Sequence, residues 1–207
     1  MSLSPATHTG PLTTVPARSV LFSMTDPARA SYLVESGAVV CGEQTRSGRA
    51  RLWLATSGDV VGEAALLGER TYAATARTLC EATLRVWVRP PMREDFADAE
   101  STALLRRVMR RVRGEIDLLE RRSTENATAR VGRVLLRLAA ELGAKEASGA
   151  ILHHGLSQTE LARIAGADRA TVNRALSAMA RRGWLTAGPG WVVLHDRVEI
   201  ERVLQHP

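Results

Sequence analysis

Apolar positions recur at helical spacing through residues 156–179, on both sides of a single glycine. Ser157 is a suitable N-cap for a first helix, and Glu160 three residues later completes a capping box. Gly166 is expected to end this helix because glycine adopts the left-handed turn conformation without steric cost. Asp168 can then cap a second helix. The pattern therefore predicts two short helices joined by a tight turn, with inward residues Leu161, Ile164, Ala165, Val172, Ala175, Leu176 and Met179.

The second predicted helix carries an outward face that suits the major groove of DNA, as in a helix–turn–helix. This face consists of Arg169, Ala170, Asn173 and Arg174. A strand opening at 182–185, a glycine–proline–glycine turn at 188–190 and a returning strand at 191–194 predict a wing directly afterwards. Asp196 and Glu199 are expected to start a last helix with a second capping box. A helical hairpin with a purely structural role is the alternative, and the wing favours DNA binding over it.

Towards the N-terminus, short β-like segments separated by turn residues fill the region from about Val15 to Val88. The candidate strands are 20–22, 32–34, 38–41, 50–54 and 83–88. Many short strands between glycine turns favour a small barrel or sandwich. Residues 1–14 are rich in Ser, Thr and Pro, and we expect them to be disordered. Because this end lacks a charged head followed by an apolar block, it is not a secretory signal.

One stretch of this β-like region could bind an anion. Gly62 and the small residues after it would let backbone N–H groups approach a phosphate, and Arg70 beyond a short loop could pair with it. Glu63 could accept a hydrogen bond from a sugar hydroxyl. The alternative is a glycine turn with a surface arginine, and spacing alone favours this alternative.

A long helix is predicted from Ser101 to Arg122. Its apolar residues alternate at spacings of four and three, which is typical of a coiled-coil seam: Leu105, Met109, Val112, Ile116 and Leu119. The seam could pack on its own domain, but its regularity favours a parallel homodimer. Ser123–Thr128 is polar and is interpreted as a hinge, and a further amphipathic helix is predicted over 129–142. His153 and His154 are adjacent on a predicted strand, so they cannot share a metal and are interpreted as ordinary polar residues.

The basic composition of the chain favours a polyanionic partner. The chain has 207 residues and a formal net charge of +6, which suits nucleic acid. The basic residues are almost all arginine, a bias that weakens each arginine as evidence. No apolar run is long enough to span a bilayer, and Cys41 and Cys80 have no metal or redox spacing. We therefore expect the two cysteines to be buried, reduced thiols in a cytoplasmic protein. No nucleophile–base constellation, metal triad or Walker loop is visible, so we expect no catalytic or metal-binding residues.

Together these segments resemble the cyclic-AMP receptor protein/fumarate-nitrate regulator (CRP/FNR) family of bacterial transcription factors. The resemblance covers about Val15 to Asp196 and depends on residues 32–37, 58–63, the seam helix, 157–161 and 168–174. It implies an α+β fold with a cyclic-nucleotide-binding-like β-roll (1–98), a dimerisation helix (99–122) and a winged helix–turn–helix domain (123–207). It also implies a homodimer that binds a two-fold symmetric promoter site and activates RNA polymerase. A nucleotide-sensing module that regulates a partner protein is the alternative.

The resemblance assigns roles to single residues. Arg169 and Arg174 match the two arginines that contact guanine in the receptor protein, whereas Ala170 replaces a glutamate and Asn173 a glycine. Arginine pairs naturally with guanine O6 and N7, Asn173 could bind adenine, and Ala170 can touch a thymine methyl. Phosphate contacts are expected from Ser157, Gln158 and Thr171.

The same resemblance leaves two alternatives for the effector, cyclic AMP or none. Gly62, Glu63, Arg70 and Thr71 are the candidate nucleotide contacts, and Arg70-Thr71 resembles the family's phosphate-binding Arg-Ser pair. However, the loop before Arg70 is shorter than in cyclic-AMP-binding members. Glu115 and Ile116 stand where those members have an adenine-contacting Thr-Ser pair, and neither can make those bonds. The cysteine cluster of the iron–sulfur oxygen sensors is absent.

Overall fold

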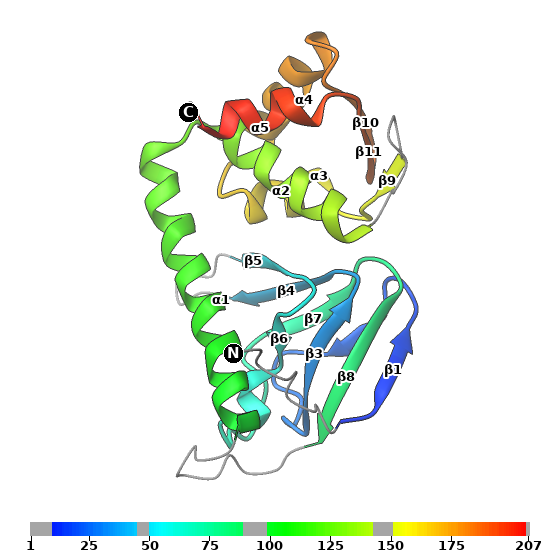
Figure 1. Cartoon of the computed structure of the whole chain (residues 1–207), viewed down its shortest axis with the longest axis vertical. Coiled ribbons are helices and arrows are strands. Elements are labelled where there is room, and N and C mark those ends of the chain that lie inside the picture. The colour runs from blue at the N-terminus through cyan, green and yellow to red at the C-terminus, as the bar shows by residue number, and fades with distance from the viewer. Residues whose placement is uncertain (1–9, 45–49, 89–98, 143–150, 206–207) are drawn as a thin grey trace, which may run out of the picture. The chain divides into compact units, whose positions relative to one another are not determined.

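The computed structural model describes residues 10–44, 50–88, 99–142 and 151–205. The chain forms two compact units, one of residues 1–43 and 55–115 and the other of residues 44–54 and 116–207. The long helix α1 contributes to both units (Figure 1).

Two antiparallel four-stranded sheets build the N-terminal β-roll (Figure 1). One sheet has the order β1-β8-β3-β6, formed by Leu12–Val15, Ala82–Val88, Ala30–Ser36 and Val60–Val61. The other has the order β2-β7-β4-β5, formed by Val20–Phe22, Thr75–Thr78, Val39–Gln44 and Ala50–Ala55. Inward-facing side chains such as Leu33, Val60, Leu66 and Trp87 pack together as a buried cluster. The five strands predicted from the sequence are all present.

Two expectations about this unit were wrong or incomplete. Residues 12–14, predicted to be disordered, belong to β1, which pairs with β8 in the register Leu12↔Arg85 to Val15↔Ala82. Backbone pairing to a buried neighbour orders a segment whose own composition is polar. The strands β6 and β7 were not predicted, since Val60–Val61 is very short and three of the four residues of Thr75–Thr78 are polar. Of the rest of the predicted disordered segment, residues 1–9 lie outside the described residues.

Helix α1 spans Ala99–Thr124, slightly longer than predicted. At about 1.5 Å per residue it is roughly 39 Å long. Helix α2, Ala127–Leu142, follows after only two residues. Asn126 caps α2 by accepting a hydrogen bond from the Ala129 N–H at 2.9 Å. The predicted hinge Ser123–Thr128 is therefore reduced to Glu125 and Asn126, because its outer residues join the flanking helices.

The C-terminal unit is a winged helix–turn–helix. Its elements after α2 are β9 (Ile151–His153), α3 (Gln158–Ile164), α4 (Arg169–Arg181), β10 (Leu185–Gly188), β11 (Trp191–Leu194) and α5 (Arg197–Gln205). The strands form one antiparallel sheet in the order β10-β11-β9. Asp196 Oδ1 accepts from the Glu199 N–H at 3.0 Å, which is one half of the predicted capping box of α5. The core of this unit joins all the helices to the sheet through residues such as Leu135, Leu161, Val172, Met179, Val192 and Ile200.

Candidate nucleic-acid interface

The turn between α3 and α4 has the local structure that the sequence predicts. Both halves of the Ser157 capping box form: the Glu160 N–H donates to Ser157 Oγ at 3.2 Å, and the Ser157 N–H donates to Glu160 Oε2 at 2.8 Å. Gly166 has φ of 65°, a conformation that only glycine adopts at little cost. Ala162 is buried where α3 packs on α4. These features fix the direction in which α4 leaves the turn.

A chain of hydrogen bonds runs along the first turn and a half of α4. Asp168 caps the helix by accepting from the Thr171 N–H at 2.8 Å, and the Thr171 hydroxyl lies 2.7 Å from Asp168 Oδ2. Arg174 Nη2 donates to Thr171 Oγ1 at 2.7 Å. The Thr171 side-chain hydrogen bond, its backbone N–H and, to a lesser extent, the Arg174 charge lower the pKa of Asp168. The ionised cap therefore helps to hold Arg174 along the helix.

Three of the four predicted base-contact residues form an exposed surface, which we call the base-contact face: Arg169, Ala170 and Arg174. Arg169 Nε donates to Gln158 Oε1 at 3.3 Å, so that a side chain from the start of α3 steadies the first residue of α4. This bond leaves the Nη1 and Nη2 groups of Arg169 without a partner among the described residues. Paired N–H groups of this kind match the O6 and N7 acceptors of guanine.

The fourth predicted base-contact residue, Asn173, is less exposed than the other three. Its side chain is half-buried, and its Oδ1 is fully buried without a hydrogen-bond partner in the described part of the chain. Asn173 lines a cavity between α4 and the wing, and it also borders a more open hollow beside Thr171 and Arg174. The helical pattern of apolar residues predicts which face points to the core, but the wing that covers an adjacent face is formed later in the chain.

The predicted phosphate contacts Ser157, Gln158 and Thr171 lie near the base-contact face, but each is already used within the protein. Ser157 caps α3, Gln158 accepts from Arg169, and the Thr171 hydroxyl bridges Asp168 and Arg174. Ser157 is exposed, whereas Gln158 and Thr171 are half-buried. Their phosphate contacts stay a prediction.

Arg130 was not predicted from the sequence to have a role. Its Nε donates to the Ala165 carbonyl at 3.0 Å and its Nη1 to the Glu125 carbonyl at 2.5 Å. Arg133 pairs with the carboxylate of the same Glu125 at 2.6 Å. Arg130 therefore connects the end of α3 to the short hinge. In a chain whose basic residues are nearly all arginine, no sequence signal separates this one from those exposed to solvent.

In the β-roll, Gly62 ends β6 with φ of 76° and precedes the 3₁₀ helix η1, Glu63–Ala65. A Cβ at this position would lie 3.0 Å from the Ala30 carbonyl oxygen and 3.1 Å from the rings of Phe22 and Tyr72. These two rings stack with centroids 3.9 Å apart, and the Tyr72 hydroxyl bonds the backbone of Ala30. Gly62 is therefore required for close packing, as well as being a candidate for anion binding.

The loop after η1 folds back on it, because the Glu69 N–H donates to the Ala64 carbonyl at 2.9 Å. The Arg70 carbonyl accepts from the Ala28 N–H at 3.0 Å, and Thr71 bridges to Pro27. The side chains of Arg70 and Thr71 are exposed. The backbone thus holds Arg70 and Thr71 at the surface after η1, which fits the alternative of a glycine turn with a surface arginine as well as a phosphate contact, so their role stays a prediction.

Comparison with known proteins decides the family. Residues 12–96 match the cyclic nucleotide-binding domain, and residues 129–203 match the Crp-like helix-turn-helix domain. The chain belongs to the CRP/FNR family. It is similar to a CRP-like cAMP-activated global transcriptional regulator of Mycobacterium tuberculosis, with 30% identity over 90% of this chain and 85% of the relative. It is also similar to the cyclic AMP receptor protein of Thermus thermophilus, with 33% identity over 91% of this chain and 85% of that protein.

The fold is shared with solved members of the family. A CRP/FNR-family transcriptional regulator from Thermus thermophilus superposes with a TM-score of 0.75 at 23% identity, covering 94% of this chain and 98% of the other. The predicted fold class, an α+β chain with a β-roll, a long helix and a winged helix–turn–helix, is thus confirmed. The protein is a CRP-family transcriptional regulator with a DNA-binding helix–turn–helix and a cyclic nucleotide-binding domain, and its relatives are regulators rather than enzymes.

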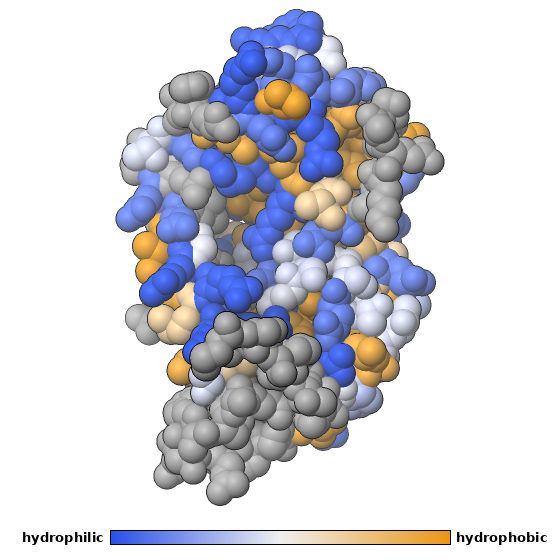
Figure 2. Space-filling view, in the orientation of Figure 1, coloured by the Kyte–Doolittle hydropathy of each residue, from blue (hydrophilic) through white to orange (hydrophobic). Residues whose placement is uncertain are grey.

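The long helix α1 of this regulator exposes apolar side chains to solvent. Four residues of the predicted seam leave large apolar surfaces exposed: Leu105 (43%), Met109 (46%), Val112 (44%) and Ile116 (51%). Figure 2 shows apolar side chains among hydrophilic ones along α1. The side chain of the fifth, Leu119, lies outside the described residues. Arg107 is turned to the β-roll instead, where its Nη1 donates to the Gly58 carbonyl at 2.9 Å.

Within the described residues, no group of three or more His, Cys, Asp or Glu side chains is placed to hold a metal ion. Among the described helices, none combines the length and the apolar character that crossing a membrane requires.

Proposed function

We propose that this regulator acts as a homodimer on a two-fold symmetric promoter site, with α4 of each protomer in the major groove. The observation that carries the proposal is the exposed base-contact face at the start of α4, where Arg169 and Arg174 are both held by side-chain hydrogen bonds. Preorganised side chains lose less conformational freedom when they meet the DNA bases. The net charge of +6 adds a sequence-independent attraction to the phosphates.

In this proposal Arg169 and Arg174 each bind a guanine through O6 and N7. Ala170 contacts a thymine methyl, and Asn173 binds an adenine once its side chain turns from the wing to the groove. Ser157, Gln158 and Thr171 contact phosphates and set the register of the protein on the duplex. A half-site read in this way contains two guanines separated by positions of weaker preference.

The exposed seam on α1 supports the homodimer. Apolar side chains at positions 105, 109, 112 and 116 are 43–51% exposed, and a parallel coiled coil would bury them against the same residues of a second copy. Such a dimer would place two copies of α4 about 34 Å apart, the separation of successive major grooves on one face of DNA. Activation of RNA polymerase from this position is the expected outcome of promoter binding.

For the effector, the proposal keeps cyclic AMP and no ligand as alternatives. The surface position of Arg70 and Thr71 beside η1 supports a phosphate site, and one relative is described as cAMP-activated. Glu115 and Ile116 lack the hydroxyl groups that would bond an adenine, which supports action without a nucleotide. A ligand would act by favouring one placement of the DNA-binding domains about Glu125 and Asn126.

The test is selection of bound sequences from a random duplex library, with the full-length protein, in the presence and absence of cyclic AMP. The expected result is an inverted repeat with guanines in each half-site. Enrichment only with cyclic AMP would assign it as the effector, and equal enrichment would assign constitutive action. Failure to enrich any sequence under both conditions would contradict the proposal and favour a module that regulates a partner protein.

A further inference from the structure

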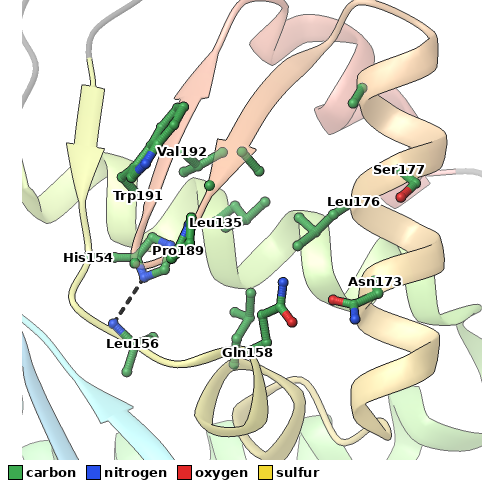
Figure 3. A pocket seen from close by; sticks show the side chains of 15 residues that line it. Leu135, His154, Leu156, Gln158, Asn173, Leu176, Ser177, Pro189, Trp191 and Val192 are labelled. Carbon is green, nitrogen blue, oxygen red and sulfur yellow. Dashed lines mark hydrogen bonds between the residues drawn. The ribbon is translucent and has the colours of Figure 1, made fainter.

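A cavity of about 470 Å³ lies in the DNA-binding domain between the recognition helix α4 and the wing (Figure 3). One wall is a face of α4 formed by Asn173, Leu176, Ser177 and Ala180, at helical spacing. The opposite wall is the wing, residues 187–192, and the floor comes from α2, the segment before α3 and the start of α3. A cavity of this volume is in the range that holds a small ligand.

Polar groups converge on this cavity from three elements (Figure 3). Asn173 Oδ1 is buried and has no hydrogen-bond partner in the described part of the chain, a state that proteins avoid unless a ligand or water completes it. Gln158 faces Asn173 across the opening, and Ser177 lies one turn further along α4. His154 lines the inner end, where its Nδ1 accepts from the Leu156 N–H at 3.1 Å.

The lining carries no charge at neutral pH. None of its fifteen residues is an Asp, Glu, Lys or Arg. Burial, and to a lesser extent the neighbouring His153, lowers the pKa of His154 to about 4, so its imidazole is neutral. Because Nδ1 accepts a hydrogen bond, the ring proton is on Nε2, which is then a donor. An anion or cation would gain no counter-charge from this lining.

The rest of the lining is flat and apolar. The Trp191 ring lies against the wing backbone so closely that a Cβ on Gly188 would be 2.4 Å from its Nε1. Leu176 and Val192 supply aliphatic surface on the two sides. A flat aromatic wall with aliphatic groups around it favours a planar ligand over a bulky one.

We propose that this cavity binds a small, uncharged, planar ligand with both an N–H donor and a carbonyl acceptor, of the cyclic-amide or nucleobase class. The N–H donates to Asn173 Oδ1, the carbonyl accepts from a polar group of the lining such as Gln158 or His154, and the ring packs on the apolar part of the lining. The combination of an unsatisfied acceptor, a neutral donor and an aromatic wall within one cavity carries this assignment.

Occupancy of the cavity changes DNA binding, a step that rests on the proposed function. Gln158, which lines the cavity, also holds Arg169 of the base-contact face. Asn173 immediately precedes Arg174, and in the proposed complex it must turn towards the groove. A ligand bonded to Asn173 keeps this residue in the cavity and removes its contact with DNA. The ligand therefore weakens binding to the specific site.

The test uses the full-length protein labelled with 5-fluorotryptophan and observed by fluorine NMR without DNA. The chain has four tryptophans, and Trp191→Phe assigns the resonance of interest. The probes are uracil and nicotinamide, with the charged analogues orotate and nicotinate as controls. We expect the neutral probes alone to shift the Trp191 resonance. Ser177→Leu, which fills the cavity, and Asn173→Leu, which removes the acceptor, should each weaken probe binding at least tenfold, whereas Thr159→Leu outside the lining should not.

No shift of Trp191 with either neutral probe would overturn the site and leave a water-filled cavity. Equal shifts with neutral and charged probes would overturn the assigned ligand class. A second titration measures affinity for the selected DNA with and without saturating uracil, and the wild type should lose at least threefold while Ser177→Leu is unaffected. Probe binding without this loss would overturn the coupling to DNA. Because the probe titration contains no DNA, its failure and the failure of the proposed function are distinguishable.

Discussion

The guanidinium of Arg174 donates a hydrogen bond to the Thr171 hydroxyl, 2.7 Å away and one turn earlier on α4. The Thr171 hydroxyl in turn donates a hydrogen bond to Oδ2 of Asp168, the ionised residue that caps the helix. The helix cap and a proposed base-contact residue are thus joined by one short network. The residue that caps α4 therefore also helps to position a side chain of the proposed base-contact face.

Thr171→Val removes this network while keeping the shape of the side chain. We expect affinity for the specific DNA site to fall about 2- to 10-fold, the effect of losing one hydrogen bond. Thr171→Ser retains the hydroxyl and should behave like the wild type. Electrophoretic or fluorescence titration with specific and random duplexes measures the change. A loss of affinity in Thr171→Ser but not in Thr171→Val would show that the methyl group, not the hydroxyl, is required.

Arg169→Ala tests direct contact with a base. Loss of a bidentate arginine–guanine pair should reduce the preference for specific over random DNA by about 1–3 kcal/mol. Arg163→Ala, which removes an exposed charge from α3, should leave this preference unchanged. Binding titrations at several salt concentrations separate the lost base contact from the lost charge. An unchanged preference in Arg169→Ala would refute its role.

Met109→Glu tests the seam on α1. A charge at an apolar seam position should disfavour a coiled coil, because burial would remove the carboxylate from water. We expect the wild type to sediment as a dimer and the variant as a monomer at micromolar concentration. Arg113→Glu, exposed and outside the seam, should remain dimeric. A monomeric wild type in analytical ultracentrifugation would contradict the proposed dimer.

Substitutions at Gly62 and Gly68 distinguish the cost of a left-handed backbone conformation from the cost of crowding in the β-roll. Gly62 and Gly68 have nearly equal φ values, 76° and 75°, but a Cβ added at Gly62 would meet neighbouring atoms within 4 Å, whereas one added at Gly68 would not. Gly68→Ala should cost about 1–2 kcal/mol from the left-handed conformation alone. Gly62→Ala should cost more, because the Ala30 carbonyl and two aromatic rings must move. Urea denaturation of both variants measures the difference, and equal losses would exclude the packing effect.

His154 makes the stability of the DNA-binding domain depend on pH. Its pKa is about 4 in the folded protein and close to 6.5 in an unfolded chain. The unfolded state therefore binds the proton first. The contribution of His154 to stability is therefore fully present above pH 6.5 and falls as the pH decreases, by about 3 kcal/mol at pH 4. His154→Gln should flatten this part of the profile in denaturant titrations. A wild-type profile that is flat between pH 6.5 and 4 would contradict the burial of a neutral histidine.

Local structure in this protein follows closely from local sequence. The capping box at Ser157, the left-handed Gly166 and the Asp168 cap depend on residues within four positions of one another, and all three form as predicted. The strands with strong β-branched or aromatic content were predicted for the same reason. The β1 strand was not, since a polar segment becomes ordered only by pairing with β8, some 70 residues away in the chain.

Periodicity and short-range hydrogen bonding were enough to predict five strands of the β-roll, the elements of the winged helix–turn–helix and the exposure of Arg169 and Arg174 on α4. Three other features became visible only in the folded chain. Arg130 joins the hinge to the end of α3, Asn173 faces a cavity under the wing, and His154 is buried and neutral. Each of these depends on which distant backbone or side chain comes to lie against a given residue, and no spacing along the chain encodes that contact.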